Sequence, residues 1–99
     1  MRTLLKVTVD INAGNKSIIE GFLPKVIQST MERIKPEAAY FLTEEGTRSC
    51  LMVFDLKDSS EIPPIAEPLF MSLNAKVTFT PVMNAEELQK GLEQWQQSQ

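Results

Sequence analysis

Few side chains in this sequence are of types that carry out chemistry, and they are spread along the chain. Asp10 and Asp55 each end an alternating run that is typical of a β-strand. If the two strands are parallel neighbours, both carboxylates lie at one end of the sheet, where a shared low-dielectric setting raises one pKa and allows acid–base chemistry. The alternative is that both aspartates begin turns, which is a frequent role for this residue at the end of a strand.

Lys6 and Tyr40 are candidates for ligand binding. Lys6 is suited to hold an anionic ligand, but a lysine on a sheet also commonly keeps its ammonium in solvent or pairs it with a carboxylate. Tyr40 can orient a substrate through its hydroxyl group, or make an ordinary hydrogen bond from a buried position. Thr8 and Thr78 add hydroxyl groups to the same predicted sheet face.

Cys50 is the single cysteine, and the chain has no histidine. Without a histidine to deprotonate it, Cys50 is best interpreted as an inert core residue. The lack of histidine also removes the most frequent general base, metal ligand and proximal haem ligand. The pairs Glu44-Glu45 and Glu86-Glu87 fit solvated turn and helix-start charges better than metal ligands. We therefore expect no cofactor and no metal, and leave open whether the protein is an enzyme.

Composition restricts the class of protein further. With 99 residues, of which 42% are hydrophobic, the chain has material for a single domain, residues 1–99. The ten Lys and Arg residues are scattered and the net charge is −3, so we expect no nucleic-acid partner. No apolar run is long enough for a membrane span or a signal peptide, and one cysteine fits a reducing compartment, so we expect no membrane association and a cytoplasmic location.

The first third of the sequence predicts a strand followed by a helix. Hydrophobic residues alternate with polar ones from Thr3 to Ile11, which is the period of a strand packed on one side. Asn15 is a candidate cap for a helix whose hydrophobic positions then recur at three and four up to Ile34. Gly21 and Pro24 interrupt this pattern, which predicts a short turn before Gly21 and a main helix over Leu23–Ile34.

The stretch Glu37–Leu56 predicts a β-hairpin whose turn contains Gly46. A loop with an even number of residues pairs Phe41 with Cys50 and Ala39 with Met52. One hairpin face is then wholly hydrophobic, and we assign it to the helices: Phe41, Cys50, Met52 and Phe54. A three-residue loop with a bulge would exchange the two faces, and this alternative stays open.

The last part of the chain predicts two helices around a strand. The hydrophobic stripe within 62–73 indicates a helix that either kinks at Pro68 or divides into two short turns. Residues 75–82 alternate again, and Pro81 is typical of an edge strand. Asn84 then caps a helix whose stripe must dock on another surface: Ala85, Leu88, Leu92 and Trp95.

This order, β-α-β-β-α-β, predicts an α+β, ferredoxin-like fold with strand order 4-1-3-2, both main helices on one face and an added C-terminal helix. We expect the first and third strands to be parallel neighbours. The other sheet face, roughly 400 Å² in extent, stays open. We expect this face to hold the candidate ligand-binding residues, which are Lys6, Thr8, Asp10, Tyr40, Asp55 and Thr78. The candidate dimer or docking contacts are Leu42, Leu51 and Val53 on the same face, and Leu88, Leu92 and Trp95 on the last helix.

In its order of elements and mixed sheet face, the chain resembles the dimeric α+β barrel proteins. The segments LPKVIQ (Leu23 to Gln28) and PVMNAEEL (Pro81 to Leu88) are also similar to small uncharacterised bacterial proteins of that group. The resemblance implies a homodimer with a small organic ligand between two sheets. No catalytic motif of the group carries over to this chain. The chain also has no histidine, which sets it apart from the haem-binding members. We expect a homodimeric small-molecule-binding protein or cofactor-free enzyme, or alternatively a structural or regulatory interaction protein with no catalytic activity.

Overall fold

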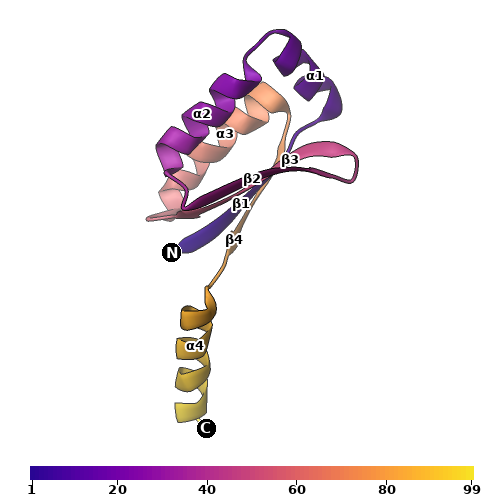
Figure 1. Ribbon diagram of the computed structural model, residues 1–99. Coiled ribbons are helices and arrows are strands. Elements are labelled where there is room, and N and C mark those ends of the chain that lie inside the picture. The colour runs from indigo at the N-terminus through magenta and orange to yellow at the C-terminus, as the bar shows by residue number, and fades with distance from the viewer.

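The computed structural model describes residues 1–99, which form one four-stranded sheet with helices on one of its faces (Figure 1). The strands are β1 (Arg2–Thr8), β2 (Ala38–Glu44), β3 (Thr47–Asp55) and β4 (Lys76–Pro81). The helices are α1 (Ile11–Ile19), α2 (Leu23–Ile34), α3 (Ile62–Leu73) and α4 (Ala85–Gln97), with the short 3-10 turn η1 (Ser59–Glu61) before α3. The fold is thus α+β, with an additional helix at the C-terminus.

The strands lie in the order β2-β3-β1-β4, which is the predicted order 4-1-3-2 counted from the other edge. Every neighbouring pair is antiparallel. The expectation that the first and third strands are parallel is therefore wrong. The hairpin makes β3 antiparallel to β2, and the crossover through α1 and α2 leaves β1 parallel to β2 with β3 inserted between them.

The hairpin has the predicted register, in which Phe41 pairs with Cys50 and Ala39 with Met52. Its two turn residues both have positive φ, 51° at Glu45 and 77° at Gly46, as a two-residue type I′ turn requires. The bulged alternative is excluded. Cys50, Met52 and Phe54 consequently face the helices and are buried, whereas Phe41 on the edge strand β2 stays 60% exposed.

The core lies between this sheet face and the helices α2 and α3. Fully buried hydrophobic side chains come from β1, β3 and α3, and the largest of them are Leu5, Val7, Met52, Phe54, Leu69 and Leu73. Phe54 meets Phe79 of β4 edge to face, with ring centroids 6.4 Å apart. Because side chains alternate between the two faces along each strand, the strand residues next to these core positions lie on the other face of the sheet.

One helix boundary differs from the predictions, and one open alternative is decided. α1 begins at Ile11, not after Asn15, because the Asp10 side chain accepts a hydrogen bond from the Ala13 amide and caps the helix. Asn15 lies inside α1 and accepts a hydrogen bond from Arg48. α3 runs unbroken from Ile62 to Leu73 with Pro68 inside it, so the alternative of two short turns is wrong.

The last helix stands apart from the rest of the molecule. α4 begins with the predicted cap, in which the Asn84 side chain accepts from the Glu87 amide and the Glu87 carboxylate accepts from the Asn84 amide. It then projects beyond the sheet on the side away from α1, α2 and α3 (Figure 1). None of its residues is buried. No helix in the chain combines the length and hydrophobicity needed to cross a membrane.

Candidate functional site

The sheet face that the helices leave uncovered, here called the open face, carries a mixed set of side chains. Its hydrophobic members, Leu4, Leu42, Leu51 and Val53, belong to three neighbouring strands. One row across the sheet joins Tyr40 to Leu51, Leu51 to Lys6 and Lys6 to Thr78. Three of the six predicted ligand-binding residues therefore share a row about 14 Å long. Thr8, a fourth, lies two residues from Lys6 along β1.

The charge at the centre of this row is already paired. The Lys6 ammonium lies 2.5 Å from a carboxylate oxygen of Glu44, which is at the hairpin end of β2. This pairing was one of the two roles considered for Lys6. Both side chains are more than a third exposed, so the ion pair contributes little to stability. An anionic ligand would have to compete with Glu44 for the ammonium.

Hydroxyl groups on the open face have unused hydrogen-bonding capacity. The side chains of Thr8, Tyr40 and Thr78 make no hydrogen bond within the chain, and Tyr40 is 68% exposed. The Ser49 hydroxyl is the one buried side-chain polar atom without a partner. Ser49 is 5% exposed and lies between Thr8 and Leu42 in the register. An unsatisfied buried hydroxyl costs about 1–3 kcal/mol, so its persistence requires an explanation.

The two aspartates are not a catalytic pair. β1 and β3 are antiparallel, with Arg2 opposite Asp55, so Asp10 beyond the other end of β1 lies about 25 Å away along the strands. Asp10 is the cap of α1, which is the turn role considered for it. Asp55 lies 2.7 Å from the N-terminal ammonium of Met1, and this contact lowers the pKa of the Asp55 carboxyl. Acid–base chemistry through this pair is therefore excluded.

Cys50 lies in the core under the helices. Burial raises the pKa of its thiol, which disfavours the reactive thiolate. No group of three or more acidic, cysteine or histidine side chains lies close enough to hold a metal ion.

An ionic cluster at the far end of the sheet attaches α4 to the domain. Arg2 forms ion pairs with Glu37, which precedes β2, and with Glu87 in the first turn of α4. Both carboxylates raise the pKa of the Arg2 guanidinium, Glu37 most strongly. The backbone hydrogen bond from Asn84 lowers the pKa of Glu87 first, and Arg2 lowers it further. Sequence reasoning missed this cluster, since its members are separated by up to 85 residues.

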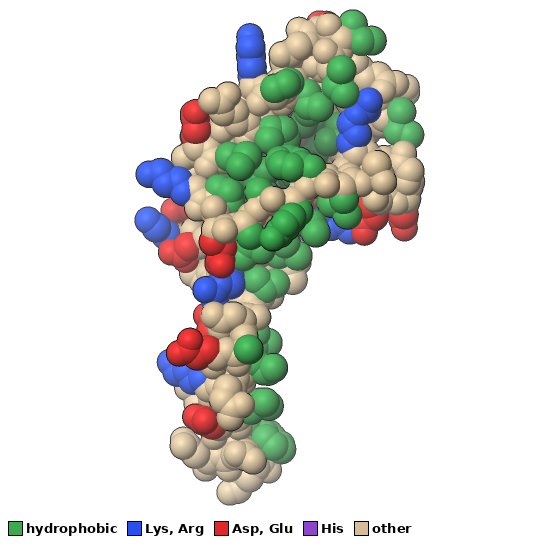
Figure 2. Space-filling model, viewed as in Figure 1, with side chains coloured by type: hydrophobic (Ala, Val, Ile, Leu, Met, Phe, Trp, Pro, Cys, Tyr) green, Lys and Arg blue, Asp and Glu red, His purple; other side chains and the backbone are tan.

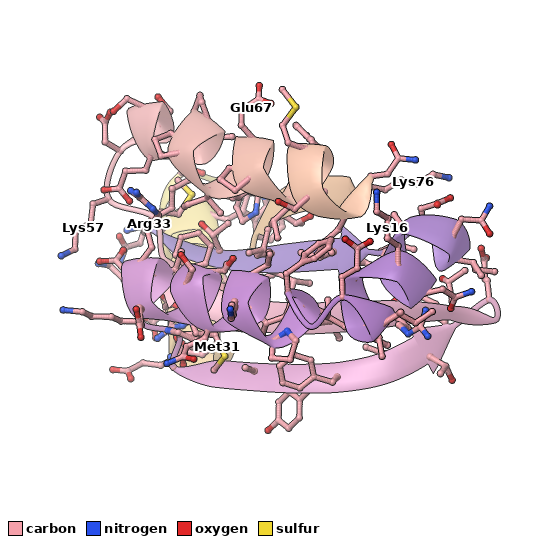
Figure 3. All side chains as sticks on the ribbon, turned by 90° about the horizontal axis from the view of Figure 1, so that it is seen from above. Lys16, Met31, Arg33, Lys57, Glu67 and Lys76 are labelled. Carbon is pink, nitrogen blue, oxygen red and sulfur yellow. The ribbon has the colours of Figure 1, made fainter.

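The larger hollows of a single chain lie off this row of the open face. One of about 760 Å³ lies at the hairpin end of the sheet and is lined in part by Thr8 and Asp10, two of the predicted ligand-binding residues. Of the two hollows beside α2, one of about 450 Å³ lies between α2 and α3, and Lys25 and Arg33 on its rim form no ion pair. A second, shallower one of about 710 Å³ runs between α2 and the edge strand β2 and is largely hydrophobic. Figure 3 shows that Arg33 points toward α3 and Met31 toward β2, so the two hollows use opposite sides of α2.

The predicted docking residues are all accessible to some degree. Leu42 is exposed, and Leu51 and Val53 are half-buried on the open face. Leu88, Leu92 and Trp95 are exposed along α4 and contact no other element.

No protein-family model matches the chain, and none of the curated proteins matches it.

Proposed function

We propose that this protein acts as a homodimer in which two open faces pair and enclose a site for a small organic ligand. The observation that carries the proposal is the open face itself, which combines hydrophobic side chains with hydroxyl groups that lack partners. Hydrophobic walls and a few convergent polar groups are the usual composition of small-molecule sites. The antiparallel order β2-β3-β1-β4, with crossovers through helices on one face, supports a ferredoxin-like fold and the resemblance to dimeric α+β barrels.

A single chain would leave this face in water. Leu51 and Val53 are half-buried only by their neighbours in the sheet, and Tyr40 is exposed. A second sheet, packed at the usual spacing of about 10 Å, would cover them and remove water from the polar row. Pairing by a twofold axis places the same row from both copies around one space, so that each ligand group would meet side chains from both protomers.

The polar groups indicate the chemistry of the ligand. Thr8, Ser49, Tyr40 and Thr78 each offer a hydroxyl that can donate or accept one hydrogen bond. Leu51 would contact a hydrophobic body. We infer a compact, largely hydrophobic molecule with carbonyl or hydroxyl groups. The Ser49 hydroxyl is covered in the single chain, so it would gain a hydrogen bond to a ligand only if the ligand displaced the side chains around it. Binding without catalysis is the core of the proposal, and turnover by a cofactor-free route is its extension.

A thermal-shift screen of the wild-type protein tests the proposal. The screen contains hydrophobic ketones, aromatic alcohols, acids and lipid-like molecules. A compound that binds the native state raises the Tm of the protein. Tyr40→Phe should keep Tm near the wild-type value and Ser49→Ala should raise it, because this change removes a buried hydroxyl without a partner; both variants should reduce the ligand-induced shift. Thr43→Ala, on the opposite side of β2 and exposed, is the matched control and should keep the full shift. Equal shifts in all three variants would contradict the site.

A structural or regulatory interaction protein with no catalytic activity is the second candidate. One observation favours it: Lys6, Asp10 and Asp55, the charged residues among the candidate site residues, all have partners within the chain. A dimer that no compound stabilises would support this function instead. A ligand that is bound and turned over would exclude it.

A further inference from the structure

α4 is the element whose hydrophobic side is uncovered along its whole length. Leu88, Leu92 and Trp95 recur at spacings of four and three, and they are 47, 49 and 61% exposed. Figure 2 shows these hydrophobic side chains along one side of the helix. The cap at Asn84 and the ion pair between Arg2 and Glu87 hold the base of the helix in place. A formed amphipathic helix without a partner surface indicates docking on another surface.

A glycine on the same side of α4 points to a close approach. Gly91 lies between Leu88 and Leu92 on the stripe, three residues after the first. Glycine inside a helix is unfavourable relative to alanine, so it usually has a packing reason. At Gly14 of α1 the reason is visible, because an added Cβ would lie 2.7 Å from Arg48. At Gly91 nothing of the chain lies within 4 Å, so any close neighbour comes from outside it.

The chain also has a groove suited to such a helix. Leu23, Ile27 and Met31 recur every four residues along one side of α2, and Phe41 of β2 faces them across the groove. In Figure 2, hydrophobic side chains gather over α2 and β2, separate from those of α4. This surface, here called the α2–β2 groove, is the most hydrophobic of the larger hollows.

Groove and stripe match in length and number of anchors. At 1.5 Å per residue, Leu23 to Met31 spans about 12 Å, and Leu88 to Trp95 spans about 10.5 Å. Each has three hydrophobic side chains at helical spacing. A helix that lays such a stripe into a hydrophobic groove is a recurrent mode of recognition.

The stripe does not lie in the groove of its own chain, because α4 projects on the side of the sheet away from α2 (Figure 1). α4 follows β4 after residues 82–84, and from Pro81 to Ala85 an extended chain spans at most about 14 Å. β4 and β2 are the two opposite edges of the sheet, about 14 Å apart, and the groove lies further away on the helix side of β2. The matching occupant is therefore the α4 of another molecule.

We propose that α4 of each protomer docks its stripe, Leu88, Leu92 and Trp95, into the α2–β2 groove of a second copy. The proposal rests on the homodimer proposed above and names the element that clasps it. α4 projects to the side of the open face (Figure 1). Paired sheets lie about 10 Å apart and α4 is about 20 Å long, so it extends past the partner's sheet to the level of the partner's helices.

The area supports the same arrangement. Stable interfaces bury about 800 Å² per partner, and the open face supplies roughly 400 Å². A stripe about 10.5 Å by 10 Å adds roughly 100 Å², and each protomer both contributes a stripe and receives one. Sheet pairing alone thus covers about half of what a stable dimer needs, and the two exchanged helices raise the covered area to roughly 600 Å² per partner.

Dimer dissociation constants, measured by sedimentation on the full chain, give the first test. Trp95→Ala removes the largest anchor twice per dimer and should raise Kd about 100-fold or more. Met31→Glu in the groove should have an effect of similar size. Lys90→Ala, which helical spacing places on the opposite side of α4, and Arg33→Ala, on the opposite side of α2, are the matched controls and should change Kd less than threefold.

Cross-linking identifies the surfaces in contact. Cys50→Ala first removes the native thiol, and Leu92→Cys and Met31→Cys are then made in two differently tagged chains. The mixture should form a disulfide between the two chains on mild oxidation. A Leu92→Cys chain that links to itself would mean that two α4 helices pair, and an internal disulfide in the double variant would mean that α4 folds back. Either result overturns the proposal.

The outcomes separate this inference from the proposed function. If Leu51→Lys on the open face dissociates the dimer while Trp95→Ala and Met31→Glu do not, the paired sheets stand and the exchanged helix is wrong. If Trp95→Ala and Met31→Glu dissociate it while Leu51→Lys does not, the exchanged helix stands without the paired sheets. A monomeric wild-type chain at micromolar concentration overturns both.

Discussion

Replacing Phe54 by alanine tests which hairpin face meets the helices, and so where the open face lies. Phe54 is 1% exposed and contacts Phe79 edge to face. Truncating a buried phenylalanine costs about 3–5 kcal/mol, and the aromatic pair adds about 0.5–1.5 kcal/mol. We expect a loss of about 4–5 kcal/mol. For a domain of this size, total stability is about 5–15 kcal/mol, so Phe54→Ala should remove a large share of it.

Phe41→Ala is the matched control because the same atoms are removed from the other strand of the hairpin. Only about two-fifths of Phe41 is covered, so we expect a loss of about 1–2 kcal/mol. Urea unfolding at two protein concentrations separates folding from association. If Phe54→Ala does not fold, Phe54→Leu serves instead, with a loss of about 1–2 kcal/mol. A loss for Phe54→Ala of only about 1–2 kcal/mol would refute the assigned face, whereas equal losses for both variants would contradict the exposure of Phe41 at the edge of the sheet.

Three further predictions follow from single contacts. Asp10→Ala should lower the free energy of unfolding by about 1 kcal/mol in urea, whereas Asp10→Asn should leave it nearly unchanged because asparagine also caps helices; equal losses would contradict the cap. Cys50 should react with a thiol reagent slowly in the native state and rapidly in urea, because burial raises its pKa; rapid native labelling would contradict this. The pKa of Glu87 is lowered in the folded state, so its stabilising contribution is complete above its ordinary pKa and is lost as pH falls through the folded value. The protection of the α4 amides relative to their intrinsic exchange rates should therefore fall below about pH 4, and Glu87→Gln should abolish that fall.

Local signals in the sequence predicted most of the fold. Gly46 indicated the turn and with it the hairpin register, and the position of Pro24 indicated the start of α2 at Leu23. Asn84 and Glu87 predicted the start of α4. The sequence order of elements also predicted the strand order. The predicted direction of β1 relative to β3 was wrong, although the hairpin and the crossover together determine that direction.

Contacts between distant residues limited the prediction of the site. α1 was expected to begin after Asn15, because the residues 12–15 are typical of a turn and Asn15 can cap a helix; only the folded chain shows that Gly14 lies inside α1 and makes room for Arg48. Lys6 reaches Glu44 across an intervening strand, a pairing that the period of the strands does not reveal. Ser49 was placed on the open face but not among the binding residues, because its burial depends on neighbours in two other strands.

The mass of the wild-type protein in solution, together with that of Leu51→Lys, tests the central claim most directly. Sedimentation equilibrium at micromolar concentration should give twice the chain mass of 11.2 kDa for the wild type. Leu51→Lys introduces a charge into the paired sheets, so it should give a folded species of 11.2 kDa with unchanged far-ultraviolet circular dichroism. A wild-type protein that sediments at 11.2 kDa, or a Leu51→Lys variant that remains fully dimeric, would contradict the pairing of the open faces.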